Sequence, residues 1–145
     1  MSKVEDFLTA KQEQALIETI QISEKNTSGE IRVHIEKATE KSPMDRALEV
    51  FYMLEMNNTE LRNGILIYVA VESKKIAIIG DEGINSLVPE NFWEDELALM
   101  LTNFKNSDYT KGLQLAIIEI GKKLKQFFPY QKNDSNELSD EISKG

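Results

Sequence analysis

The sequence predicts an α/β fold, an αβα three-layer sandwich in which a small mixed sheet of Rossmann-like character has helices on both faces. Residues 65–71 are continuously apolar but form too short a run for a typical helix, which indicates a central strand buried on both sides. The apolar residues 76–79 follow after a short turn and must pair antiparallel, because a parallel return needs a crossover of roughly a dozen residues. A helical pattern separates residues 30–36 from the central strand, which predicts a parallel strand–helix–strand unit.

Composition sets the limits on function. The chain of 145 residues is 41% hydrophobic, enough for the core of one domain, which we place over residues 1–130. With 25 acidic and 17 basic residues the formal net charge is -8, which disfavours nucleic acid as a ligand and favours cations or basic partners. The sequence has no cysteine, which excludes disulfides, thiolate metal sites and a cysteine nucleophile. No stretch approaches the roughly 20 apolar residues of a membrane span, so we expect a cytoplasmic protein without a transmembrane segment.

The first half of the chain reads as helix, strand and helix. Residues 9–25 predict a helix with Thr9 as its N-cap and Leu16 and Ile20 in its buried stripe. Residues 30–36 alternate, which predicts a strand with one apolar face and one half-exposed face that carries Arg32, His34 and Glu36. The next helix begins at Ser42 and Pro43 and runs to about Met56.

Two helical stripes follow the hairpin. The first spans residues 92–104 and contains Trp93, whose spacing is more typical of the core than of a ligand platform. The second repeats apolar residues at steps of three and four from Leu113 to Phe128, and Pro129 ends it. Beyond it, residues 131–145 contain few large apolar side chains and predict a disordered C-terminal tail.

Connectivity brings polar residues to one edge of the predicted sheet. The hairpin places Asn63, before the central strand, beside Asp81, after the reversed strand. If residues 30–36 run parallel to the central strand, Glu30 begins at the same edge. We therefore expect Glu30, Asn63, Asp81 and Glu82 to lie near one another.

At these residues the chain resembles the TPM-domain family, small α/β domains found in bacteria, in chloroplast thylakoids and in animal membrane-associated proteins. The resemblance covers about residues 9–130. It rests on segments 28–33, 62–67 and 78–84, and on Tyr109, Gly112-Leu113 and Ala116 ahead of Phe128-Pro129. The resemblance implies an αβα sandwich, a divalent-cation site in the acidic loops and a reported acid phosphatase activity.

The acidic edge is the candidate metal site. Carboxylate and amide oxygens suit hard cations, so Glu30, Asn63, Asp81 and Glu82 are the predicted ligands of Ca²⁺ or Mg²⁺, with Gly83 permitting a tight turn. The alternative for Asp81-Glu82 is a polar turn that ends a strand. Arg62 either holds an anionic group beside a metal or, as we favour, pairs with a neighbouring carboxylate.

An enzyme is the alternative to a binding module. His34 is the only histidine and its strand position indicates a bystander, while Gly83 stands where an aspartyl-phosphate mechanism based on Asp81 would need an acid. The remaining route is a metal-activated water with Glu82 or Glu30 as base. No catalytic residue is assigned.

The sequence thus predicts a small divalent-cation (calcium) binding domain that acts as a regulatory or interaction module with a protein partner. The alternative is a metal-assisted acid phosphatase that hydrolyses phosphomonoesters. A structural partner of membrane complexes is a third interpretation.

Overall fold

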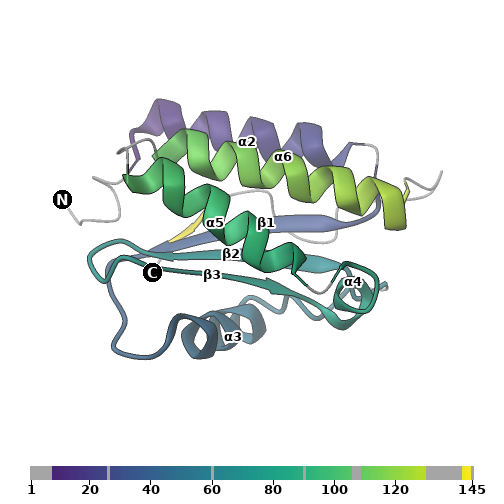
Figure 1. Cartoon of the computed structure of the whole chain (residues 1–145), viewed down its shortest axis with the longest axis horizontal. Coiled ribbons are helices and arrows are strands. Elements are labelled where there is room, and N and C mark those ends of the chain that lie inside the picture. The colour runs from purple at the N-terminus through teal and green to yellow at the C-terminus, as the bar shows by residue number, and fades with distance from the viewer. Residues whose placement is uncertain are drawn as a thin grey trace.

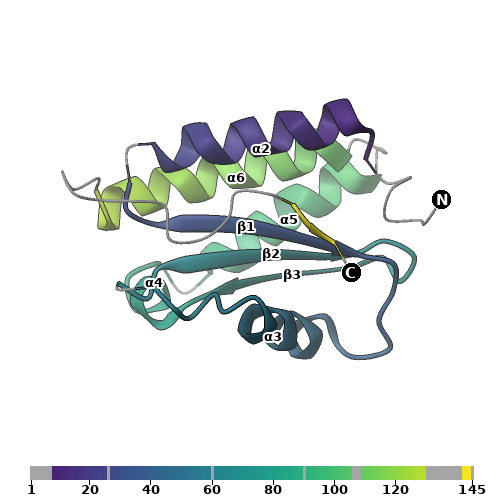
Figure 2. The same cartoon turned by 180° about the vertical axis from the view of Figure 1, so that it is seen from behind.

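The computed structural model describes residues 8–25, 27–59, 61–89, 91–105, 109–129 and 142–144. Helices α2, α5 and α6 cover one face of the sheet and α3 covers the other, as Figures 1 and 2 show from opposite sides. The predicted αβα three-layer sandwich is therefore confirmed. The elements in chain order are α2 (Ala10–Glu24), β1 (Glu30–Glu36), α3 (Pro43–Met53), β2 (Gly64–Ala70), β3 (Lys75–Gly80), α4 (Glu82–Asn85), α5 (Phe92–Lys105), α6 (Tyr109–Phe127) and β4 (Ser143–Lys144).

The sheet has the strand order β3-β2-β1-β4. Strands β1 and β2 are parallel, with Glu30 opposite Gly64, and β2 and β3 are antiparallel, with Ile65 opposite Gly80. Both pairings agree with the connectivity argument. Since β4 also runs parallel to β1, the sheet is mixed.

Local sequence sets the starts of the first two helices. The Thr9 side chain accepts a hydrogen bond from the Gln12 N–H, and the Gln12 side chain accepts one from the Thr9 N–H, which makes a capping box ahead of α2. Ser42 caps α3 through the Asp45 N–H, and Pro43 occupies the first helical position. Both predicted caps are confirmed.

Two cores lie on opposite faces of the sheet. The larger one joins α2, α5 and α6 to the odd-numbered residues of β1 and β2, and it includes the predicted Leu16 and Ile20. The smaller one lies under α3 and contains Ala47, Val50, Phe51, Met56, Leu66, Tyr68, Ala70, Ala77 and Ile79. Within the described residues, no helix is both long enough and apolar enough to cross a membrane.

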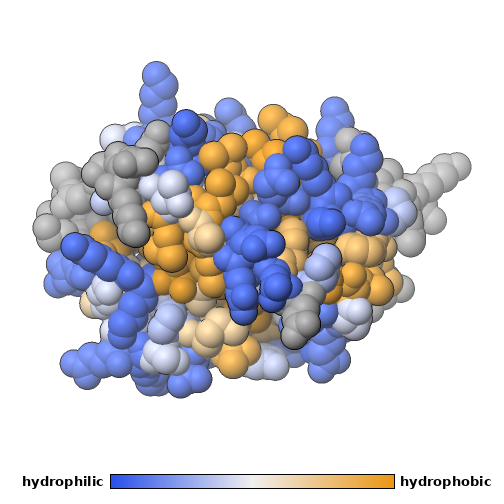
Figure 3. Space-filling model, in the orientation of Figure 1, coloured by the Kyte–Doolittle hydropathy of each residue, from blue (hydrophilic) through white to orange (hydrophobic). Residues whose placement is uncertain are grey.

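Helix α6 faces the sheet with the stripe that the sequence predicts. Leu113, Ile117, Ile120 and Leu124 are fully buried, whereas Ile118 lies on the outer face and is 40% exposed. Figure 3 shows apolar atoms between charged side chains on the surface in the region of α5 and α6. Apolar atoms contribute more than half of the accessible surface of typical folded proteins, so their exposure alone does not indicate a function.

The C-terminal end of the chain differs from the expectation of a disordered tail. Ile142 is buried against the larger core, and β4 pairs with β1 at His34 and Ile35. The prediction of a disordered tail is wrong for residues 142–144. Residues 131–141 and 145 lie outside the described part of the chain. The segment docks despite its polar composition because one apolar side chain reaches the core and the backbone reaches a sheet edge.

The polar face of β1 is also different from the prediction. His34 and Glu36 are buried rather than half-exposed, and only Arg32 keeps intermediate exposure. Helix α3 packs over this side of the sheet and contributes Arg46, which pairs with Glu36. The alternation of apolar and polar residues is present as predicted, but the polar side chains of His34 and Glu36 contact other polar side chains instead of water.

Glu96 of α5 is a buried acid whose ionisation should lower the stability of the domain. It is buried, its Oε2 has no hydrogen-bond partner among the described residues, and burial, with Glu119 and Asp95 nearby, raises its pKa to about 7. An acid whose pKa is higher in the folded state loses its stabilising contribution as the pH rises from its usual 4.5 through about 7.

We therefore expect Glu96→Gln to raise the free energy of unfolding by about 1–3 kcal/mol at pH 8, because it removes a buried charge that lacks a partner. At pH 5, where the folded carboxyl is protonated, the variant should resemble the wild type. Urea unfolding at both pH values measures this difference. Equal effects at pH 5 and pH 8 would contradict a titrating Glu96.

Candidate functional site

The predicted polar edge forms at the start of β1 and β2. The Glu30 N–H donates to the Asn63 carbonyl at 3.4 Å, and the Asp81 N–H donates to the Gly64 carbonyl at 2.9 Å. Glu30, Asn63 and Asp81 therefore meet at one edge, as the connectivity predicts. Each of the three residues is at most 5% exposed, so their polar groups are almost fully withdrawn from water.

Strand alternation places two of these side chains on the same face. Ile31 and Ile65 belong to the core beneath α2, α5 and α6, so Glu30 and Gly64 face the α3 side. Continuing the alternation of β3, in which Ile79 faces α3, puts Asp81 on that side as well. Glu30 and Asp81 thus lie on either side of Gly64, the first residue of β2. Because Gly64 has no side chain, β2 places no side chain between them.

The Asp81 carboxylate pairs with the guanidinium group of Arg62. Arg62 Nε donates to Asp81 Oδ2 at 2.8 Å and Nη2 donates to Oδ1 at 3.1 Å, which is a bidentate pair. Asp81 Oδ1 also accepts from the Glu82 N–H at 2.8 Å and so caps the short helix α4. Of the two readings of Arg62, the structure shows pairing with a neighbouring carboxylate.

Glu82 lies apart from this group. Its side chain is 83% exposed, and Oε1 is 4.0 Å from Arg62 Nη2. Residue 82 is the first position of α4, and its carboxylate extends into solvent beside the guanidinium. The structure brings together three of the four predicted ligands and leaves Glu82 at their rim.

Asn63 has unused hydrogen-bonding capacity. Its side-chain Nδ2 is buried and has no acceptor among the described residues, and the same holds for the hydroxyl of Thr59. Rotation of the terminal amide would exchange the Nδ2 donor for the Oδ1 acceptor at this place. Buried polar groups without a partner are rare in folded proteins, which makes Asn63 a candidate ligand at this edge.

Gly83 lies in the single helical turn of α4 and also permits close packing. No glycine among the described residues has a positive φ, so the backbone conformation of this turn does not itself require glycine. A methyl group at residue 83 would lie 2.1 Å from the Leu61 carbonyl oxygen and 2.5 Å from that of Arg62. Because the Gly83 N–H donates to the Arg62 carbonyl at 2.7 Å, α4 and the loop before β2 are held backbone to backbone.

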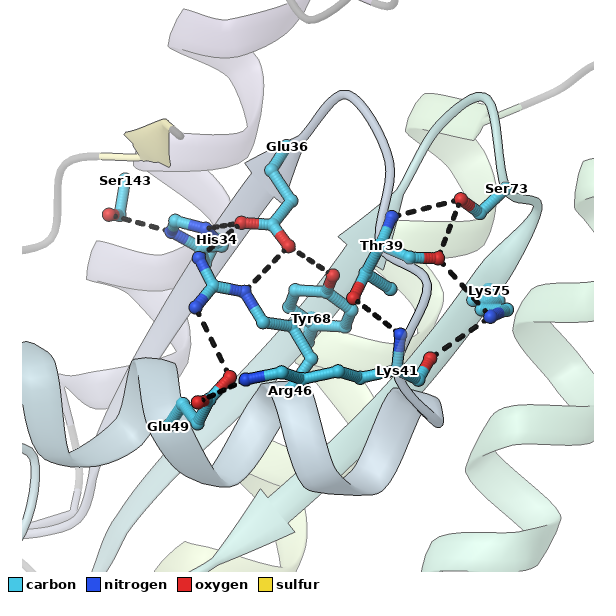
Figure 4. Close-up of polar contacts among 10 residues, drawn as sticks. All are labelled: His34, Glu36, Thr39, Lys41, Arg46, Glu49, Tyr68, Ser73, Lys75 and Ser143. Atoms are coloured by element: carbon cyan, nitrogen blue, oxygen red, sulfur yellow. Dashed lines mark hydrogen bonds and ion pairs between the residues drawn. The ribbon is translucent and has the colours of Figure 1, made fainter.

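A second polar cluster, which the sequence did not predict, lies between β1 and α3 (Figure 4). The Glu36 carboxylate accepts hydrogen bonds from Arg46, from the Tyr68 hydroxyl and from His34 Nε2, at 2.9 Å from Arg46 and 3.0 Å from His34. His34 also stacks on Tyr68, with ring centroids 5.9 Å apart. The one available signal was a tyrosine in an otherwise apolar strand, since a buried hydroxyl needs a partner.

The charges of this cluster follow from its hydrogen bonds. Burial by itself would raise the pKa of Glu36, but hydrogen bonds from Arg46, Tyr68 and His34 outweigh it and lower the pKa to about 2. Burial lowers the pKa of His34 even though Glu36 opposes the shift. The ionised Glu36 can only accept, so His34 Nε2 carries the proton, and Nδ1 of the neutral ring accepts from the Ser143 hydroxyl at 2.9 Å. His34 is therefore part of the packing and not a free base.

Metal-ligating residues are not gathered into a complete cage. Among the described residues, no three His, Cys, Asp or Glu side chains lie close enough together to hold a metal ion. The donor set at the polar edge is nevertheless made of oxygen ligands, the type that Ca²⁺ and Mg²⁺ take. It already binds a cationic group, the guanidinium of Arg62.

Comparisons with known proteins agree with this fold. The chain is similar to BA42 from the psychrophilic bacterium Bizionia argentinensis, whose NMR structure superposes with a TM-score of 0.91 at 49% identity and 100% coverage of both chains. It shares the fold of the N-terminal domain of a protein from P. gingivalis, with a TM-score of 0.70, 15% identity and coverage of 83% of this chain and 78% of that one. Comparison with curated proteins gives no match. The model of the TPM domain matches residues 1–123, and the chain therefore belongs to the TPM-domain family.

Proposed function

We propose that the domain is a divalent-cation binding module, in which Ca²⁺ or Mg²⁺ exchanges with the Arg62 guanidinium at the polar edge. The observation that carries the proposal is the juxtaposition of buried Glu30, Asn63 and Asp81 beside a cationic side chain that is itself 38% exposed. Arg62 can swing into water without disturbing a core. Its departure would leave the Asp81 carboxylate able to ligate an ion. Since no three acidic side chains of the described residues are already close enough together to hold a metal ion, Glu30 and Glu82 would have to move toward the ion, and the Asn63 amide oxygen is a further ligand in this proposal.

The backbone at Arg62 supports an exchange of this kind. Arg62 has φ 52°, a left-handed conformation that costs a non-glycine residue about 1–2 kcal/mol. The Asp81 pair and the hydrogen bond from Gly83 to the Arg62 carbonyl hold it there. A strained backbone conformation persists only where surrounding contacts hold it. Residues in such conformations cluster at binding and switching sites.

Charge favours a divalent ion over a monovalent one. Glu30, Asp81 and Glu82 supply three carboxylates against the single positive charge of Arg62, and the whole chain carries a net charge of -8. An ion that displaces Arg62 must bind the site more strongly than Arg62 binds Asp81. This requires an ion with a higher charge or with more ligands. Cation binding would then expose the guanidinium beside the site, a surface change that a partner of the module can detect.

An NMR amide-shift titration with Ca²⁺ and with Mg²⁺ tests the proposal. We expect shifts at residues 30, 63 and 81 in the wild type, and weaker binding in Asp81→Asn and Glu30→Gln because each loses one charged ligand. Arg62→Gln should bind about tenfold or more tightly, since it removes the competing cation. Calcium should also raise the melting temperature, and at a given concentration the rise should be larger for the variants that bind more tightly.

Glu72→Gln is the matched control, because it removes one exposed carboxylate at the far end of the sheet, beyond β2. It should bind like the wild type. If Arg62→Gln and Asp81→Asn both match the wild type, the proposed site is wrong. If Glu30→Gln alone has no effect, the ion is held on the β3 side of the edge.

A further inference from the structure

The exposed edge of β1 carries a segment from the other end of the chain. Among the described residues, strand β4 pairs with β1 at His34 and Ile35, two of the seven residues of β1. The Ile31 N–H, near the start of β1, donates to Glu24 Oε2 at 2.7 Å, so that part of the edge is capped by α2. Within the described part of the chain, β4 is the only segment that pairs with this edge over residues 32–36, and its pairs are at two of them.

Each residue of the docked segment meets a different chemical feature. Ile142 is buried in the larger core, the Ser143 hydroxyl lies 2.9 Å from His34 Nδ1, and Lys144 Nζ lies 2.8 Å from Glu13 Oε1. Ile142 and Lys144 face the α2 side and Ser143 faces the α3 side, as strand alternation requires. The edge thus recognises an apolar, a hydroxyl and a basic side chain in that order.

The side chains that contact the docked segment come from α2 and β1. Glu13 comes from α2 and His34 from β1, and Glu36 fixes the His34 ring so that Nδ1 points to the hydroxyl. Arg32 adds a fourth feature two residues before His34, because its Nε is buried and has no hydrogen-bond partner among the described residues. An acidic side chain two places before the hydroxyl would suit it.

We infer that the β1 edge is a peptide-docking site, that the C-terminal segment is its internal occupant, and that a partner protein displaces it with an extended segment of the pattern acidic, apolar, hydroxyl, basic. Addition of a strand to a sheet edge is a common mode of peptide recognition, in which backbone hydrogen bonds give affinity and alternate side chains give specificity. The described part of the internal occupant pairs with only two residues of β1. A longer strand gains additional ladder bonds along residues 32–36.

This docking site is independent of the proposed cation site, since it lies on the opposite edge of β1 from β2 and uses other side chains. The occupant is a separate partner rather than a second copy, because copies that each carry a charge of -8 repel one another. Tethering gives the internal segment an effective concentration on the order of millimolar, so the wild type should resist free peptide.

Fluorescence anisotropy with a labelled peptide of the sequence of residues 137–145 tests the inference on the full chain. Ile142→Asp places a charge where the core is apolar and should release the internal segment. We expect the peptide to bind this variant at least tenfold more tightly than the wild type. Lys144→Glu, at an exposed side chain that meets Glu13, should open the same edge if Ile142→Asp does not fold.

Side-chain specificity supplies the controls. Glu13→Gln in the Ile142→Asp chain should weaken peptide binding several-fold, and a peptide with glutamate in place of its final lysine should not bind. Equal binding to wild type and both opened variants, or no binding to either opened variant, would overturn the inference. So would a wild-type dimer that disappears in Ile142→Asp, because the occupant would then be the C-terminal segment of a second copy.

Discussion

Glu36→Ala is expected to lower the free energy of unfolding by about 3–5 kcal/mol, as is usual when one partner of a buried ion pair is removed. The substitution leaves Arg46 without its buried partner and removes the acceptor for Tyr68 and His34. Urea denaturation at pH 7 measures the loss. Glu49→Ala is the matched control, since Glu49 pairs with the same Arg46 but its side chain is 43% exposed. An exposed pair of this kind contributes at most about 1 kcal/mol.

The same carboxylate predicts a pH dependence. The folded pKa of Glu36 is about 2, below its usual 4.5, so its contribution is complete above about pH 4.5 and is lost as the pH falls through about 2. The unfolding free energy of the wild type should therefore fall over this range more steeply than that of Glu36→Gln. Parallel pH profiles for the two proteins would show that Glu36 is not held ionised by its partners.

Ile120→Ala is expected to cost about 2–5 kcal/mol, because it removes buried methyl and methylene groups and leaves a cavity between α6 and the sheet. Ile120 is fully buried in the larger core. Ile118→Ala on the same helix is the matched control, since Ile118 is 40% exposed and has less burial to lose. Chemical denaturation of both variants gives the comparison. A loss below about 1 kcal/mol for Ile120→Ala would mean that this position tolerates the cavity by local collapse.

Much of the fold follows from the sequence because its signals are local. The continuous apolar run of β2, the short turn before β3 and the 3.6-residue period of α6 each lie within one segment, and steric connection rules then fix their relative directions. Those directions are enough to bring Glu30, Asn63 and Asp81 to one edge. The candidate site was thus predicted by connectivity, without any local motif of ligands.

Its internal arrangement was not predictable in the same way. Whether the Asp81 carboxylate meets Arg62 or a cation, and whether Glu82 faces inward, depends on backbone turns and on the approach of α4 to the loop before β2. Gly83 illustrates the limit. Its sequence context is that of a turn, yet its missing side chain is required by a contact with a segment some twenty residues earlier in the chain.

The sequence by itself determined α2, α3, α5, α6 and the strands β1 to β3, the relative directions of these strands and the edge at which the acidic residues meet, since periodicity and connection length are properties of contiguous residues. Only the tertiary structure decided that His34 and Glu36 are buried beneath α3 and that residues 142–144 close the β1 edge. Both outcomes depend on partners ten or more residues away, Arg46 for Glu36 and Ser143 for His34. A polar side chain looks the same in sequence whether it meets water or a distant partner, because burial is a property of the packed chain.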